Sequence, residues 1–537
     1  MNFIKLLIVI LSIASLLLFK GCGSTGGESI RLSEQAASQP MAVKSETMKE
    51  LTYSKKDMAG AQDAREKEFN TEEYKYTPEN KFLEAIENPL STFSIDVDTA
   101  SYSNIRRFLT GGTLPPKDSV RIEEMVNYFT YDYPEPKKDE PFSVNTEISQ
   151  CPWSPKSKLV LFGLQAKKIS MEKLPQMNLT FLLDVSGSMS APNKLPLLKQ
   201  AFSLLANQLR PKDKVSIVVY AGAAGMVLPP TSGAEKNKII DAFEKLQAGG
   251  STAGGQGIAL AYKIAKENFM KQGNNRIILA TDGDFNVGAS SEGELVRMIE
   301  DRRKDGIFLT VLGFGMGNYK DSKMESLADK GNGNYAYIDN LSEAKKVLVT
   351  QMGGTLLTIA KDVKIQVEFN PAKVKSYRLI GYENRMLAKE DFADDKKDAG
   401  ELGAGHTVTA LYEIVPADRA PKSEDTKYTS TKIKEEAKNS KEVMLLKLRY
   451  KKPTAEDSIL LTYPVLEAGN DFDKASNNLR FASTVAAFGM VLKNSEFKGN
   501  ADLIKIFNWA QNAKGTDKEG YRTEFLELVK AAQKLKQ

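Results

Sequence analysis

The chain has 537 residues, which is too long for one hydrophobic core and predicts two to four domains. Its hydrophobic content of 41% and charged content of 27% are typical of a folded globular protein. The net charge of +5 is small, and lysines alternate with acidic residues, which disfavours a nucleic-acid-binding protein. Two cysteines and one histidine exclude a disulfide scaffold and a Cys/His zinc site, and leave His406 as the only imidazole base.

The first 22 residues predict export and a lipid anchor. A short basic start precedes an apolar run, residues 6–19, that is shorter than the roughly 20 residues of a membrane-spanning helix. A signal peptide is therefore favoured, with an uncleaved N-terminal anchor as the alternative. The following "KGCGS" resembles a bacterial lipobox, which implies lipidation of Cys22 and attachment to a membrane of the bacterial envelope, with the outer membrane favoured. Cys151 then has no partner, and we expect it to be buried as an apolar side chain.

Residues 23–78 are small, polar and charged, and they predict a flexible tether because they contain too few large apolar residues to form a core. Residues 79–170 predict a small N-terminal α/β module. Its strand 92–98 alternates in polarity, and Thr99 is expected to cap a helix that ends at a glycine pair.

Residues 171–354 predict a doubly wound α/β domain with a mostly parallel sheet. Continuous apolar strands alternate with amphipathic helices, a pattern typical of a sheet covered on both faces. The run 225–231 contains two prolines and is expected at a sheet edge. The predicted strands are 178–186, 213–221, 275–283, 307–315 and 333–339.

Residues 355–537 predict a β-sandwich followed by three amphipathic helices that pack on it. A lysine- and glutamate-rich loop, about 420–441, interrupts the strands. The sequence therefore predicts an N-terminal module, a doubly wound domain and a C-terminal domain, after the signal peptide and tether.

Oxygen-bearing side chains follow three elements of the predicted doubly wound domain. Ligands of open parallel sheets bind at the carboxyl ends of strands, so we expect these side chains to meet there. Carboxylate and hydroxyl oxygens are the ligands that hard cations such as Mg²⁺ prefer. The candidate ligands are Asp184, Ser186, Ser188, Thr252 and Asp282.

Three motifs carry these residues: D-x-S-x-S at 184–188, a threonine after "GGS", and "TDG" at a strand end. Together they resemble the metal-ion-dependent adhesion site of von Willebrand factor type A (VWA) domains. The resemblance implies that the five residues hold Mg²⁺ or Mn²⁺. The flanking segments "FSIDVDTASYSNIRRFL" and "LPPKDSVRIEEMVNYF" resemble bacterial VWA lipoproteins of the YfbK type, which implies the same three-part architecture.

Two further motifs have simpler explanations. The stretch "IDVDTASYS", 95–103, echoes the metal loop, but strand-end carboxylates before a helix explain it. The stretch "GFGMGN" has Asn318 where a dinucleotide fingerprint needs glycine, so no nucleotide site is expected.

The sequence favours a binding protein whose bound metal ion coordinates an acidic residue of a protein partner. A metal-independent structural or assembly scaffold is the alternative. A metal-assisted hydrolase is disfavoured because no base or nucleophile lies near the motifs, so the chain is not expected to be an enzyme.

Overall fold

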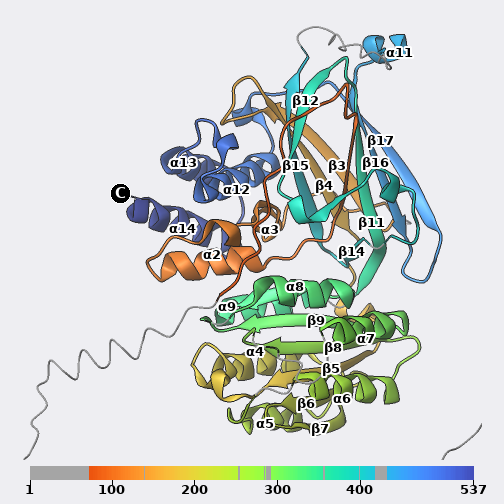
Figure 1. Cartoon of the computed structure of the whole chain (residues 1–537), viewed down its shortest axis with the longest axis vertical. Helices are drawn as coiled ribbons and strands as arrows, with labels where there is room; N and C mark the ends of the chain where they lie inside the picture. The colour runs from red at the N-terminus through yellow and green to blue at the C-terminus, as the bar shows by residue number, and fades with distance from the viewer. Residues whose placement is uncertain are drawn as a thin grey trace, which may run out of the picture. The chain divides into compact units, whose positions relative to one another are not determined.

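A computed structural model describes residues 72–137, 140–251, 254–283, 285, 292–317, 319–352, 354, 357–397, 399–417 and 432–536 (Figure 1). The predicted signal peptide with Cys22, and most of the predicted tether, lie outside the described residues. Among the helices that are described, none combines the length and apolar character needed to cross a membrane.

The doubly wound domain has a six-stranded sheet in the order β10-β9-β8-β5-β6-β7. Every pairing is parallel except that of the edge strand β7 with β6, which confirms the predicted fold class and the edge position of the proline-containing run. The strands are β5 (Met177–Asp184), β6 (Lys214–Tyr220), β7 (Ala224–Ser232), β8 (Asn274–Thr281), β9 (Ile307–Phe314) and β10 (Tyr335–Ile338).

Helices cover both faces of this sheet, as Figure 1 shows. One face packs on α4 (Leu195–Gln208), α5 (Lys236–Glu244) and α9 (Leu341–Lys345). The other packs on α6 (Gly254–Glu267), α7 (Glu292–Lys304) and α8 (Asp321–Lys330). Because helices cover both faces, every residue of β5 is buried, and its apolar side chains point to both sides of the sheet.

The flanking segments form a β-sandwich of two antiparallel sheets. One sheet has the order β1-β12-β15-β4-β3, and the other has the order β13-β2-β11-β16-β17 with β14 also paired to β11. Strands β1 (Leu83–Glu84), β2 (Leu90–Ser94), β3 (Phe142–Gln150) and β4 (Lys158–Ala166) precede the doubly wound domain. The strands that follow it are β11 (Thr358–Phe369), β12 (Val374–Ile380), β13 (Met386–Leu387), β14 (Gly400–Gly403), β15 (Thr407–Pro416), β16 (Glu442–Lys451) and β17 (Ser458–Leu466).

The structure differs here from the predicted division into a module at 79–170 and a domain at 355–537. Strand β2 pairs with β11, and β4 pairs with β15, so both segments contribute to each sheet. The physical reason lies in β4, where Val160 and Phe162 face the other sheet while Leu159 and Leu161 face the helices. A strand buried on both faces needs neighbours on every side, and the N-terminal segment alone does not provide them.

The helices of the two flanks also share one core. Helices α2 (Ala100–Thr110) and α3 (Ile122–Asn127) pack with α12 (Asn477–Lys493), α13 (Leu503–Ala513) and α14 (Tyr521–Lys536). Phe129 lies edge-to-face against Phe481 and Phe525 at ring-centroid distances of 4.9 and 5.8 Å. Cys151 is buried in the same core, as predicted.

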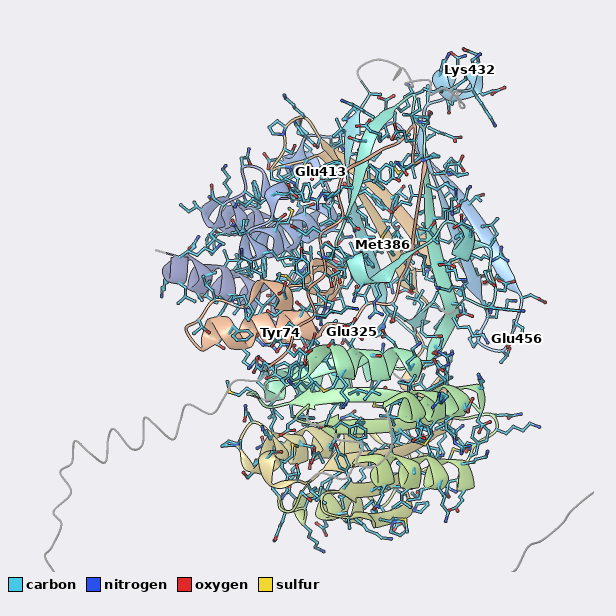
Figure 2. The ribbon with its side chains drawn as sticks, in the orientation of Figure 1. Tyr74, Glu325, Met386, Glu413, Lys432 and Glu456 are labelled. Carbon is cyan, nitrogen blue, oxygen red and sulfur yellow. The ribbon has the colours of Figure 1, made fainter. Side chains whose placement is uncertain are left out.

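Three arginines of the flanking segments bind carboxylates of the doubly wound domain. Arg106 donates to Asp339 at 2.8 Å and to Glu343 at 2.7 Å, and Arg121 pairs with Asp321. Arg385 binds Asp329 at 2.6 Å and Glu325 at 2.8 Å. Glu325, labelled in Figure 2, therefore lies on the face of α8 that meets the flanking segments.

The shared core predicts that residues 355–537 do not fold alone. That fragment lacks β2 and β4, and it exposes the apolar faces of α12 and β15 that those elements and α3 cover. We expect the isolated fragment to show no cooperative urea transition, whereas residues 72–537 unfold cooperatively. A native-like cooperative transition in the isolated fragment would contradict the shared core.

Candidate metal centre

The candidate site lies where the order of strands in the doubly wound sheet reverses. Strand β5 is flanked by β6 on one side and by β8 on the other, and Leu183 pairs with Ala280 near the carboxyl ends. Asp184 is the last residue of β5, and Asp282 follows the last residue of β8. Parallel pairing therefore places both carboxylates at one edge of the sheet, where ligands of such folds bind.

Asp184 is fully buried and accepts three hydrogen bonds. Its Oδ1 accepts from the backbone N–H of Ser186 at 2.9 Å. Its Oδ2 accepts from the hydroxyls of Tyr220 at 3.2 Å and Thr281 at 3.3 Å. Burial raises the pKa of Asp184 to about 6, the bonds from Ser186 oppose this, and the charge of Asp282 adds to it. The carboxylate is thus held in position by neutral donors, and none of the ion pairs among the described residues involves it.

Ser188 lies in the short 3₁₀ turn that follows β5, and Ser186 is the extended residue just before this turn. The hydroxyls of Ser186 and Ser188 are 3.0 Å apart, with Ser186 buried and Ser188 exposed. The backbone N–H of Gly187 donates to the carbonyl of Gly250 at 3.0 Å, which joins this turn to the glycine-rich loop. Gly250 has a φ of +81°, a conformation that glycine adopts without strain. Thr252, two residues further on, lies outside the described residues.

Asp282 is fully buried and forms an ion pair that the sequence analysis missed. The ammonium of Lys194 donates to Asp282 Oδ2 at 2.8 Å. Lys194 directly precedes α4, and only 7% of the residue is exposed. The sequence signal for Lys194 is weak, because it is a single lysine before an apolar helix in a chain that has 74 lysines and arginines.

The described donors fit a small hard cation. Asp184, Ser186, Ser188 and Asp282 offer only carboxylate and hydroxyl oxygens, and Lys194 cancels one of the two negative charges. In the described part of the chain, no group of three or more His, Cys, Asp or Glu side chains is arranged to hold a metal. The four oxygen-bearing residues could hold Mg²⁺ or Mn²⁺, with water and a partner group completing the shell.

The other motifs have structural roles. Asp96 and Asp98 pair with Arg385 at 3.0 and 3.2 Å, which accounts for the stretch that echoes the metal loop. Thr99 occupies the N-cap position of α2, but its side chain makes no capping hydrogen bond. Instead, Glu124 accepts from the N–H of Ser101 at 2.8 Å.

His406 lies in the turn before β15, with its ring packed against Gly354. Burial lowers the pKa of His406 to about 4, and the positive charge of Lys346 adds to this. Its neighbours belong to the sandwich and to the end of the doubly wound domain.

Comparisons with known proteins agree with this architecture. The family model described as "von Willebrand factor type A domain" matches residues 179–284, and one described as "von Willebrand factor" matches residues 68–161. A third, "Uncharacterized protein YfbK, C-terminal", matches residues 354–535. The chain is thus a VWA-domain protein, and domains of this class in general mediate protein–protein interactions and often bind a divalent metal.

A curated relative identifies the family more closely. The chain is 43% identical over 469 residues to "Uncharacterized protein YfbK" of Escherichia coli K12, covering 86% of this chain and 81% of the relative. The chain therefore belongs to the YfbK family. It is also 29% identical over 182 residues to protein sll0103 of Synechocystis, of which it spans 42%.

Solved structures resemble the chain as well. A von Willebrand factor type A protein from Catenulispora acidiphila shares 16% identity and a TM-score of 0.40, covering 72% of this chain and 89% of that one. BatB from Bacteroides thetaiotaomicron shares 24% identity and a TM-score of 0.28, covering 33% and 97%.

The buried pair of Lys194 and Asp282 predicts a pattern of stabilities in chelator-treated protein. Asp282→Asn leaves a buried ammonium without its carboxylate, and we expect a loss of about 3 kcal/mol in the free energy of unfolding. Adding Lys194→Met removes the stranded charge and should restore about half of that loss. Urea unfolding measures both, with the exposed Asp241→Asn as the control. Strictly additive effects would mean that the pair does not interact.

Proposed function

We propose that this protein binds a protein partner through a divalent ion held at the VWA site. The observation that carries this proposal is the pair of buried carboxylates, Asp184 and Asp282, beside hydroxyls that reach the surface at Ser188. A divalent ion would offset the net negative charge of this site. With few protein ligands, it would keep positions for an acidic side chain of the partner.

We propose binding rather than catalysis. Metal-assisted hydrolysis needs a base that can reach the reacting water. His406, the single histidine of the chain, is half-buried in the turn before β15, where its ring packs against Gly354. The competing function is a metal-independent structural or assembly scaffold. The ion pairs of Arg106 and Arg385 join the flanking segments to the VWA domain, and such a scaffold would need the same joints.

The proposed metal site is tested by Asp184→Asn. This change removes one of the two carboxylate charges but keeps an oxygen that can accept from Tyr220 and Thr281. We expect affinity for Mn²⁺ and Mg²⁺ to fall at least about tenfold, because the remaining hydroxyls are neutral. Calorimetry measures the affinity and circular dichroism checks the fold, with Asp241→Asn as the matched control.

Capture of partners from envelope extracts separates the two functions. With the wild-type protein as bait, partners that are released by chelator and are not captured by Asp184→Asn support the metal-dependent function. Partners captured equally by both baits, with and without chelator, support the scaffold. Wild-type metal affinity in Asp184→Asn would refute the assignment of this residue.

We further propose that the protein is attached to a membrane of the bacterial envelope, with the outer membrane favoured, through lipidated Cys22. The support is the apolar run 6–19 followed by Gly21 and Cys22. Cys22→Ala is expected to leave the protein unprocessed or to release it from membrane pellets, as judged by fractionation and mass spectrometry. A Cys151→Ala protein is the control. A Cys22→Ala protein that matures and sediments like the wild type would overturn the anchor.

A further inference from the structure

The side chain of Lys194 follows a defined path into the candidate metal site. Its aliphatic stem crosses the loop after β9 at Gly315, where a Cβ atom would lie 2.3 Å from Lys194 Cε and 2.6 Å from Cγ. Gly315 also has a φ of +77°, so this position both favours glycine and leaves room for the lysine. At the end of this path, the ammonium reaches Asp282 Oδ2 at 2.8 Å.

A bound metal and the lysine would compete for the same carboxylate. The oxygen of Asp282 that accepts from Lys194 cannot give the same electron pair to a metal ion. An ammonium and a divalent cation at one buried carboxylate also repel each other strongly, because the surrounding dielectric constant is low. Asp184, by contrast, accepts from the backbone N–H of Ser186 and from neutral hydroxyls, including those of Tyr220 and Thr281, which bring no positive charge.

We propose that Lys194 is a tethered cation that occupies the metal-free site and is displaced from Asp282 when the metal binds. This inference rests on the proposed metal-dependent function. The lysine compensates the charge of Asp282 in the absence of metal, and its release adds a cost to metal binding that sets the affinity of the site.

Displacement of the lysine also changes the support of the neighbouring loop. The stem leaves its place over Gly315, and the next residue, Met316, is 51% exposed. Gly317 in the same loop donates its N–H to Glu72 at 2.9 Å. Metal binding at Asp282 is thereby coupled to the surface formed by this loop beside the site.

Lys194→Met in the full-length protein tests the competition. This variant keeps the apolar stem and removes the competing charge, so its affinity for MnCl₂ by calorimetry should be about tenfold or more above that of the wild type. Lys199→Met, which lies in the helix that follows Lys194 and is partly exposed, should leave the affinity unchanged. Equal affinity of the wild type and Lys194→Met overturns the competition while leaving the metal site intact. Absence of binding in both overturns the proposed function as well.

Chemical labelling of the wild type provides a test that needs no Lys194 variant. In chelator, the buried ammonium should resist reductive methylation, and saturating MnCl₂ should raise labelling of Lys194 at least about fivefold by peptide mass spectrometry. Lys199 should be labelled equally in both conditions. In Asp184→Asn protein, at Mn²⁺ concentrations that do not load its site, Lys194 should stay protected. Protection of Lys194 in Mn²⁺-saturated wild-type protein overturns the proposed displacement.

Discussion

The antiparallel pairing of β4 with β15 is the constraint on which the rest of the architecture depends. It joins Lys158–Ala166, which precede the VWA domain, to Thr407–Pro416, which follow it. The VWA domain is therefore an insertion whose two ends return to one sandwich. Pairing of β2 with β11 repeats this closure in the second sheet. These contacts join residues that are far apart in sequence, so formation of the sandwich has a large cost in loop-closure entropy. The sandwich also requires both flanking segments to be present.

Buried and half-buried ion pairs connect this sandwich and its helices to the VWA domain. Arg385 binds four carboxylates, those of Asp96, Asp98, Glu325 and Asp329. Burial, followed by the charge of Asp96, raises the pKa of both Asp98 and Asp329. Because their pKa values are raised in the folded state, the carboxyls of Asp98 and Asp329 contribute stability that is present at low pH and is lost as the pH rises through those values. Such pairs add little net stability, but a missing partner would be costly.

The local pattern of the sequence was sufficient to predict the VWA domain. Apolar strands such as β5 and helices such as α4 alternate over short distances, and the strand ends at 184 and 282 carry the predicted oxygens. The assembly of the flanks was not predictable in this way. The apolar run of β4 indicates a strand, but no local signal indicates that its partner is β15, about 250 residues later.

In the candidate site too, some residues are predictable from the local sequence and others are not. Asp184, Ser186 and Ser188 are adjacent in sequence, so their motif is recognisable. The role of Lys194 follows only from its contacts with Gly315 and Asp282, which come after strands β9 and β8 and are distant from it in sequence. The described end of the predicted tether is a further case: Glu72 binds Arg107 at 2.7 Å and Gly317 at 2.9 Å, and its neighbours include Tyr74, labelled in Figure 2.

These contacts make the loop after β9 a shared support of the site and of the N-terminal segment. Lys194 packs on Gly315 from one direction, and Glu72 accepts from Gly317 from another. Tyr337 donates to the carbonyl of Gly315, and the guanidinium of Arg107 lies 5.4 Å from the ring of that tyrosine. The loop is thus held at both glycines by Tyr337 and Glu72, and Arg107 contacts both of these side chains. A change in the position of Lys194 therefore cannot be confined to Asp282, because its stem is part of the packing that fixes this loop.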